Sequence, residues 1–582
     1  MINKYFEEEL RYLYESGKEF AQAHPDRARF LNIDAVGDRD PYVERLFEGF
    51  AFLTARIREK LDDSFPELTE GLVNLMWPQF LQEIPSAAIV QFKPRPGLLS
   101  ETKVLPRGSE VLSGPAGPES VPCRFMTTQD VRLNPITLRG AEKSTDNRGN
   151  AQMVLRFAID EKASWANLSL SPLRLYLYGE RPTALTLREF LTSRISAASI
   201  DVNGGRARVE CDPFSVCTPG GFSSSESLLP ADRRCCNAGA LLLEYFAYPE
   251  KFMFVDLWGC DRIPVCDPQP SSLAFTLRFN GDMPADIRIS AENFRLFCSP
   301  VINLYRSDIE PIDHTGAQEE YRLIADAGHP RSSAVHSVVR VTGVDRITGR
   351  RYDYEPLYTF ANMGKPGQRT FSVRRVRGPD GAVRKHLILG GDGLEGLELR
   401  RQTLNVEAWC SNGSLPREEI AEAGINRGGR GFPDYIMVSN ITRPTLPCLP
   451  PDSDDYLWVF LSHQGSNYLS LSSAEALKAF LALYNWSGDE GNAKRIDAIS
   501  DVAAYPAEKN AGAGIIRGVR FEVSITSSSF SSSADIRLFG DILKEFLGQY
   551  VSINSFLELV LVQKPSGRTI TFAPQAGTQW LI

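Results

Sequence analysis

The N-terminal part of the chain contains a helical signature, Asp40-Pro41-Tyr42-Val43-Glu44-Arg45-Leu46-Phe47-Glu48-Gly49-Phe50-Ala51-Phe52-Leu53. Asp40 is a suitable N-cap and Pro41 suits the first helical position, so a helix is predicted to begin here. Its apolar residues recur every three or four positions, through Val43, Leu46, Phe50, Leu53, Ile57 and Leu61, and Phe65-Pro66 is predicted to end it. Because Phe47 and Phe52 lie off this stripe, the helix is predicted to be apolar on more than one face.

Two further helices are predicted around this stretch. Residues 4–24 form the first, and Glu67–Leu81 form the second, which is apolar nearly all round. Three short helices cannot cover this much apolar surface among themselves, so they pack either on the domains that follow or on helices of a partner; the sequence leaves both open. The residues predicted to make such contacts are Phe6, Leu10, Leu13, Phe20, Val43, Leu46, Phe47, Phe50, Leu53 and Ile57.

Beyond residue 85 the hydrophobic period changes from helical to two, which is typical of strands, and helical insertions are predicted at Thr183–Ile195 and Ala238–Phe246. Val373–Arg377, a Gly378-Pro379-Asp380-Gly381 turn and Ala382–Arg384 indicate a hairpin. In the last part, Tyr456–Leu461 is predicted as a strand, Ser472-x-x-Glu475 as the start of a helix, and Ala534–Tyr550 as a helix before a strand at Phe556–Gln563.

These patterns predict an α+β multi-domain protein. Its parts are an N-terminal helical segment (1–85), a β-rich domain with helical insertions (86–334), a second β-rich domain (335–450) and a C-terminal α/β domain (451–582). With 582 residues the chain is long enough for several domains.

Charge and composition exclude several classes. The net charge is -8, whereas a nucleic-acid-binding protein usually carries a basic stripe. The N-terminus has no signal-peptide pattern and no run of about 18 apolar residues occurs, so we expect a cytoplasmic protein without membrane insertion. The one basic region, 369–401, alternates Arg with Val; this favours a solvated sheet face or a protein contact over nucleic acid.

No cofactor or metal is expected. The densest cysteine cluster, Cys211, Cys217, Cys235 and Cys236, lacks the paired spacing of a zinc site, so buried thiols in a reducing compartment are favoured. Gly391-Asp392-Gly393-Leu394-Glu395-Gly396 matches a dinucleotide-binding pattern, but the residues after it favour a strand where the motif needs a helix.

No catalytic arrangement is evident. Cys298 and His314 are near in sequence, but nothing in the sequence orients them. Since glycosidases use carboxylates that are distant in sequence, a β-rich carbohydrate-active hydrolase remains the alternative function.

The chain resembles the TssF family, also called VasA or ImpG, of the bacterial type VI secretion system. The resemblance rests on an ordered series of motifs along the chain. They are Phe6–Leu13, Phe20-Ala21-x-x-His24-Pro25, Asp40–Leu53, Lys60–Asp63, Glu244–Phe252, Pro300–Leu304 and Ser552–Phe556.

This resemblance implies a structural baseplate subunit without enzymatic activity. It implies that two copies associate with one TssG to form a wedge, joined by TssE and the TssK adaptor, around the spike hub. It also implies that the baseplate docks at the cytoplasmic face of the membrane, where sheath contraction injects toxins.

Overall fold

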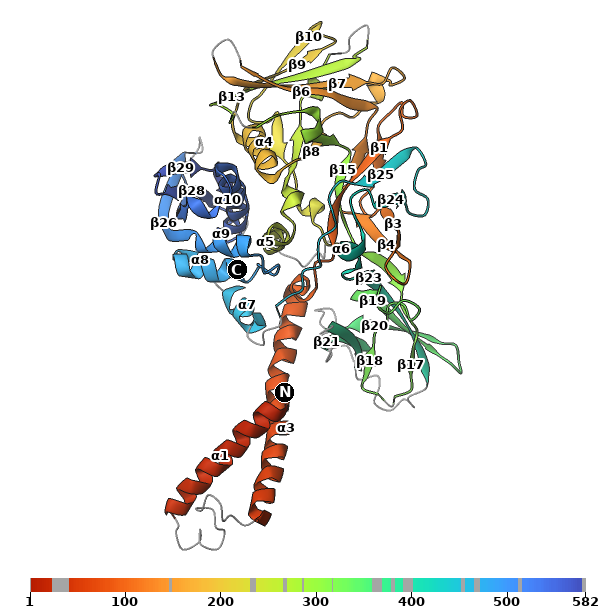
Figure 1. The fold of residues 1–582 in the computed structure, drawn as a ribbon, viewed down its shortest axis with the longest axis vertical. Coiled ribbons are helices and arrows are strands. Elements are labelled where there is room, and N and C mark those ends of the chain that lie inside the picture. The colour runs from red at the N-terminus through yellow and green to blue at the C-terminus, as the bar shows by residue number, and fades with distance from the viewer. Residues whose placement is uncertain are drawn as a thin grey trace. The chain divides into compact units, whose positions relative to one another are not determined.

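The computed structural model describes residues 2–23, 41–145, 149–230, 237–264, 269–284, 287–316, 318–357, 369–377, 383–390, 401–451, 456–464, 471–510 and 515–577. The chain forms two compact units. The first contains Met1–Met76 and Asp452–Ser462, and the second contains the rest (Figure 1).

The first unit is built of helices. Its helices are α1 (Ile2–Ala23), α3 (Pro41–Met76) and α7 (Tyr456–Gln464). The predicted start at Pro41 is confirmed, but the predicted end at Phe65-Pro66 is wrong, because α3 is 36 residues long and continues to Met76. Proline removes a single backbone hydrogen bond and tends to bend a helix, which does not oblige the helix to end there. The predicted third helix is therefore the C-terminal part of α3 followed by a short 3-10 turn, Pro78–Leu81.

The predicted strand at Tyr456–Leu461 is also wrong, since these residues belong to α7. Tyr456, Leu457 and Phe460 are buried at a spacing of one and four residues, which is the spacing of a helix face. A short apolar run fits a strand and a buried helix equally well by periodicity.

The second unit begins with a six-stranded sheet in the order β24-β3-β4-β15-β1-β25. Its strands are β1 (Ala87–Pro94), β3 (Glu110–Ala116), β4 (Val121–Thr127), β15 (Cys298–Ile302), β24 (Ile425–Gly428) and β25 (Ile436–Asn440). β1 pairs antiparallel with β15 on one side and with β25 on the other, so three distant parts of the sequence meet in one sheet. A separate pair joins β2 (Lys103–Leu105) and β5 (Val131–Leu133).

The middle of the chain forms two smaller sheets. The five-stranded sheet, in the order β10-β9-β13-β7-β6, consists of β6 (Ile136–Thr145), β7 (Ala151–Ile159), β9 (Ile195–Val202), β10 (Ala207–Cys211) and β13 (Ser272–Phe279). The four-stranded sheet, in the order β11-β12-β8-β14, consists of β8 (Leu173–Leu177), β11 (Cys217–Pro219), β12 (Phe254–Leu257) and β14 (Phe294–Leu296). The helical insertions predicted at Thr183–Ile195 and Ala238–Phe246 are α4 (Arg181–Ser193) and α5 (Asn237–Ala247).

The second β-rich part of the chain forms an eight-stranded sheet. It consists of β16 (Tyr305–Asp308), β17 (Ile312–His314), β18 (Glu320–Arg322), β19 (Ala334–Asp345), β20 (Arg351–Pro356), β21 (Thr370–Arg377), β22 (Val383–Gly390) and β23 (Gln402–Ser411). The predicted hairpin is confirmed as the antiparallel pair β21–β22. One face of the sheet encloses a core that includes Tyr321, Val341, Phe371, Leu387 and Leu404. The short helix α6 (Leu415–Glu419) follows β23.

The C-terminal part is an α/β layer. Its elements are α8 (Ala474–Ala482), α9 (Glu490–Asp497), β26 (Ile499–Asn510), β27 (Ile515–Thr526), α10 (Ser533–Gly548), β28 (Phe556–Lys564), β29 (Arg568–Thr571) and β30 (Gln575–Ala576). β27 and β28 are parallel and α10 connects them, as in a βαβ unit. The N-cap of α8 is Ser473, one residue after the predicted Ser472, and its side chain accepts from the Ala476 N–H.

The predicted fold class, an α+β multi-domain chain, is confirmed. The domain limits at 85/86, 334/335 and 450/451 stay predictions. Within the described ranges, no helix is long and apolar enough to cross a membrane.

Candidate partner-binding surface

Helix α3 has one face packed on α1. Ala51 and Ala55 are fully buried, and their small side chains allow the two helices to approach closely. Along the same face Phe47 meets Tyr14 of α1, with ring centroids 6.0 Å apart. On α1, Gly17 is buried at a corresponding contact position.

A second face of α3 is apolar and uncovered. Tyr42, Leu46, Phe50, Leu53 and Ile57 are 86%, 68%, 61%, 59% and 61% exposed. At roughly 100° per residue these five positions fall within an arc of about 80°, opposite the face that packs on α1. We call these five residues the α3 stripe; it runs for about 22 Å along the helix.

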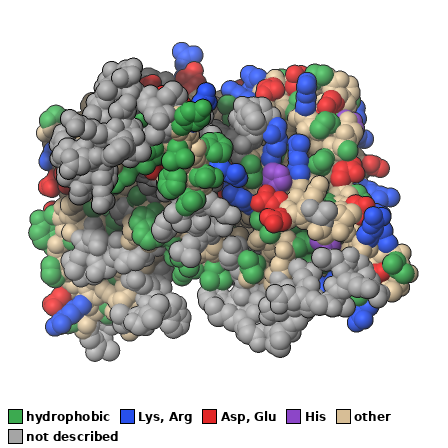
Figure 2. Space-filling view, turned by 90° about the horizontal axis from the view of Figure 1, so that it is seen from below, with side chains coloured by type: hydrophobic (Ala, Val, Ile, Leu, Met, Phe, Trp, Pro, Cys, Tyr) green, Lys and Arg blue, Asp and Glu red, His purple; other side chains and the backbone are tan. Residues whose placement is uncertain are grey.

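An uncovered stripe of this kind is unusual in a chain that works alone. Single exposed apolar side chains are common, but contiguous ones mark interaction surfaces. Figure 2 views the molecule from below and shows that hydrophobic side chains are exposed on that face. The described charged neighbours of the stripe, Arg45 and Arg56, lie at its border, which resembles the polar rim of an interface.

The predicted contact residues divide into two groups. Leu46, Phe50, Leu53 and Ile57 are exposed on the α3 stripe. Phe6, Leu10, Leu13 and Phe47 are half-buried, and the side chains of Phe20 and Val43 lie outside the described residues.

Sequence reasoning missed Tyr42 and the exposed side chains of α7. Tyr42 stands four residues before Leu46, so an earlier start of the helical spacing would have included it. Trp458 and Val459 are 61% and 36% exposed on the side of α7 away from Phe460. Because this segment was predicted as a strand, its exposed helical surface was not predicted.

Cys298 and His314, which were considered as a catalytic pair, do not contact each other. Cys298 is buried and its thiol faces the Leu296 carbonyl, whereas the His314 Nδ1 lies 2.8 Å from the Tyr321 hydroxyl. Burial raises the pKa of the Cys298 and Cys217 thiols, which disfavours the reactive thiolate. Among the described residues no group of three or more His, Cys, Asp or Glu is placed to hold a metal ion. Cys235, Cys236 and Gly391–Gly396 lie outside those residues.

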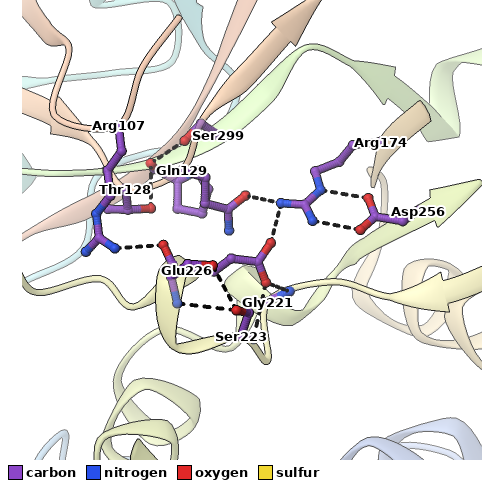
Figure 3. Close-up of polar contacts among 11 residues, drawn as sticks. Arg107, Thr128, Gln129, Arg174, Gly221, Ser223, Glu226, Asp256 and Ser299 are labelled. Carbon is purple, nitrogen blue, oxygen red and sulfur yellow. Dashed lines mark hydrogen bonds and ion pairs between the residues drawn. The ribbon is translucent and has the colours of Figure 1, made fainter. Parts of the chain in front are cut away.

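A charged cluster around Arg174 has a structural role. Arg174 of β8 donates to both carboxylate oxygens of Asp256 at 2.7 Å, to the Gln129 Oε1 at 2.8 Å, and pairs with Glu226 (Figure 3). Burial lowers the pKa of Arg174, but its hydrogen bonds and the two carboxylates outweigh burial and leave the pKa raised. Glu226 also accepts from the Gly221 N–H at 2.8 Å and closes a capping box with Ser223.

The loop that carries Glu226 is held from its other side by Arg107. The Arg107 guanidinium donates to the carbonyls of Ser225, Ser227 and Leu229 at 2.7, 2.8 and 2.9 Å. The carboxylates of Glu226 and Asp256 are both paired with Arg174, so the cluster fixes a loop between sheets and neither acid is free.

The motif Glu244–Phe252 has a similar structural role. The Glu244 carboxylate accepts from the Leu228 N–H at 2.7 Å and pairs with the buried ammonium of Lys251. Tyr245 packs on Phe252 and on Phe539 of α10, and the Phe246 carbonyl accepts from Asn492 at 3.0 Å. This segment therefore joins the middle sheets to the C-terminal α/β layer.

Comparisons with known proteins identify a family and a similar protein. Residues 1–579 match the family described as Type VI secretion system, TssF. The chain is 29% identical over 623 residues to the type VI secretion system component TssF1 of Pseudomonas aeruginosa, covering 99% of this chain and 98% of that protein.

Two solved structures are similar over nearly the whole length. A chain of the TssK-TssF-TssG baseplate subcomplex has a TM-score of 0.77 at 34% identity, covering 92% of this chain and 99% of that one. A chain of the type VI secretion baseplate complex has a TM-score of 0.65 at 33% identity, with both chains fully covered. The family match, the relative and the shared fold together establish that this chain belongs to the TssF family of the type VI secretion system.

Proposed function

We propose that the chain is a structural subunit of the type VI secretion baseplate, which binds TssG-like and TssK-like subunits and works without catalysing a reaction. The family and the subcomplex in which a 34% identical chain was solved support this role over that of a carbohydrate-active hydrolase. The proposal includes a second copy of the chain, a TssE-like subunit and the spike hub as further partners, and docking at the cytoplasmic face of the membrane.

The observation that carries the proposal is the α3 stripe. Its five side chains have more than half of their surface exposed, yet they are aligned on one helix face. Burial of apolar side chains contributes about 25 cal/mol per Å², so a stripe of this size favours a helix of a partner packed against α3. We propose that the TssG-like subunit supplies this helix.

The test is co-purification of the tagged full-length chain with the TssG-like and TssK-like subunits of the same organism. The variant Phe50→Asp/Leu53→Asp places two charges in the stripe. Because buried apolar anchors each contribute about 2 kcal/mol or more, the double variant is expected to weaken the complex at least 100-fold. Lys18→Glu is the matched control, since it changes the net charge by the same amount at an exposed position of α1, outside the stripe.

The variant proteins are first compared with the wild type by circular dichroism and thermal melting. If the wild-type chain co-purifies with neither subunit, the baseplate role is wrong. If Phe50→Asp/Leu53→Asp co-purifies as the wild type does, the baseplate role stands and the stripe is not the contact.

A further inference from the structure

Strand β26 lies at one edge of the C-terminal sheet, whose strand order is β26-β27-β28-β29 (Figure 1). It is 12 residues long, and among the strands that the structure describes it pairs with β27 alone. We call the side of β26 that faces away from β27 the β26 edge. An open edge of this length presents backbone N–H and C=O groups, and these can pair with a strand of another chain.

The hydrogen bonds of β27 show in which direction its backbone groups point. The Thr526 N–H donates to the Ala498 carbonyl, just before β26, so Thr526 faces β26. The Arg517 carbonyl accepts from the Ser555 hydroxyl at 2.8 Å, and Ser555 directly precedes β28. Because backbone groups alternate in direction along a strand, the even-numbered residues of β27 face β26 and the odd-numbered residues face away from it.

This alternation fixes the direction of Pro506 on β26. Pro506 is directly opposite Val519 of β27, which is an odd-numbered residue and therefore faces away from β26. In an antiparallel pair, two residues that stand opposite each other either both face inward or both face outward. The backbone nitrogen of Pro506 therefore lies on the β26 edge, where the side chain is also exposed.

Pro506 interrupts the row of hydrogen-bond donors on the β26 edge. The other residues of β26 that face the same way are Val502, Ala504, Glu508 and Asn510. Proline has no N–H, and its ring occupies the space in which the carbonyl of a pairing strand would lie. Only two donors remain in a row on either side of it. A strand of about five or six residues, which is the usual length, pairs through about three such positions.

The side chains near the β26 edge favour pairing. Tyr505 of β26 and Ile515 and Ile516 of β27 are exposed, and aromatic and β-branched side chains are those that stabilise strands. Glu508 and Lys509 are exposed charges of opposite sign, so they do not repel a second edge of the same sequence. The missing N–H is therefore the main obstacle to pairing along this edge.

We propose that Pro506 prevents the β26 edge from pairing with the β26 edge of a second copy of this chain. Two identical strands that pair antiparallel form the self-complementary contact of a two-fold axis, so one copy is a suitable partner for another. A proline at the centre of the edge then blocks the contact twice, once from each copy. The proposal depends neither on the α3 stripe nor on the baseplate role.

Pro506→Thr tests the proposal in the full-length chain, because threonine restores the N–H and favours strands. Sedimentation velocity is measured over a wide range of protein concentration. Pro506→Thr is expected to raise the association constant between copies about tenfold or more over the wild type. Pro506→Ala restores the same N–H with a poorer strand former, so it should associate less than Pro506→Thr and more than the wild type.

Two further variants locate the effect. Pro506→Thr/Ala504→Pro moves the proline to the neighbouring position that faces the edge, and is expected to sediment like the wild type. Pro118→Thr replaces an exposed proline in a turn outside this sheet, and should also sediment like the wild type. Hydrogen exchange of peptides that cover β26 should be slower in associated Pro506→Thr than in the wild type.

Thermal melting of each variant is compared with that of the wild type first, and Pro506→Ala serves as the test if Pro506→Thr melts lower. Sedimentation of both single variants at Pro506 like the wild type would overturn the proposal. Association that persists in Pro506→Thr/Ala504→Pro, or that Pro118→Thr shows equally, would also overturn it, since the contact would then lie elsewhere on the chain.

Discussion

Arg188 and Asp541 lie on helices 353 residues apart in sequence and form a nearly buried ion pair. The Arg188 side chain is 1% exposed; its Nη1 lies 2.8 Å from the Asp541 carboxylate and its Nε donates to the Phe252 carbonyl at 3.0 Å. The pair joins α4 to α10. The sequence does not predict this pair: Asp541 has a local partner in Arg537, 3.7 Å away and four residues earlier on α10, and only the packing of the two helices brings Arg188 to it.

Replacing Asp541 by Asn should therefore destabilise the contact between these helices. It leaves a buried guanidinium without its carboxylate, and removing one partner of a buried pair costs about 3 kcal/mol. We expect thermal melting to shift several degrees lower. Asp497→Asn, at an exposed position of α9, should leave the melting curve unchanged. Equal melting of the two variants would mean that the pair contributes nothing to stability.

His336 provides a test that depends on pH. Burial, with Lys385 nearby, lowers the pKa of His336 from 6.5 to about 3. Between these two pH values the unfolded chain therefore binds more protons than the folded chain. The contribution of neutral His336 to the free energy of unfolding is complete above pH 6.5 and is lost as the pH falls toward 3. At about 1.4 kcal/mol per pKa unit, the loss is on the order of 5 kcal/mol.

His336→Gln keeps a donor for the Glu83 carbonyl, which the His336 Nε2 contacts at 2.9 Å, but does not titrate. The variant is expected to lose less stability on acidification than the wild type. Melting temperatures measured at pH 7, 5.5 and 4 should therefore diverge as the pH falls. Parallel curves would show that His336 is not the group that limits acid stability.

At the scale of single elements, local sequence rules predict the bounds of many helices and strands, and they fail where tertiary packing determines the structure. Capping and hydrophobic spacing give the start of α3, the helix α10, the strand β28 and the β21–β22 hairpin close to their observed bounds. They fail at Pro66, where a proline lies inside a continuous helix. They fail again at Tyr456–Leu461, where six apolar residues fit a strand until burial of Tyr456 and Phe460 on one face shows a helix.

Two helical glycines show how packing can reverse a propensity rule. Alanine in place of an exposed helical glycine stabilises a helix by roughly 0.5–1 kcal/mol. We expect that gain for Gly49→Ala, since a Cβ on Gly49 would meet nothing within 4 Å. A Cβ on Gly540 of α10 would lie 2.2 Å from Phe572 and 2.7 Å from Leu561, so Gly540→Ala should lower the melting temperature. A melting temperature raised by both substitutions would contradict the close packing of α10 on β28.

At the scale of the whole molecule, the sequence predicts the fold class and the absence of a recognisable catalytic motif, but not the arrangement of the sheets. β1 pairs with β25 some 350 residues later, and periodicity carries no information about which strands meet. The same holds for the exposed part of the candidate site. Apolar spacing predicts that α3 has more than one apolar face, yet only the packing on α1 shows that Leu46 and Phe50 remain uncovered while Phe47 is half-buried.

A structural subunit and an enzyme also differ in how they lose function. An enzyme can lose a factor of about 10³ or more through one reacting carboxylate while its fold stays intact. In this chain the buried carboxylates Glu226, Glu244 and Asp256 are each held by a cation or by backbone N–H groups. Their replacement by amides is expected to lower the melting temperature and the amount of folded protein. Killing of target cells should then fall only in proportion to the folded protein that remains.

The measurement is a scan of every Asp and Glu to Asn and Gln, scored by target-cell killing, by the level of folded protein and by co-purification with the TssG-like subunit. Exposed carboxylates such as Glu44 should have no effect, since Glu44 lies on a different side of α3 from the stripe. Phe50→Ala and Leu53→Ala should each reduce co-purification and killing together, because they remove buried area from the same contact. One carboxylate whose amide abolishes killing at wild-type folding and assembly would place an active site in this chain and refute a purely structural role.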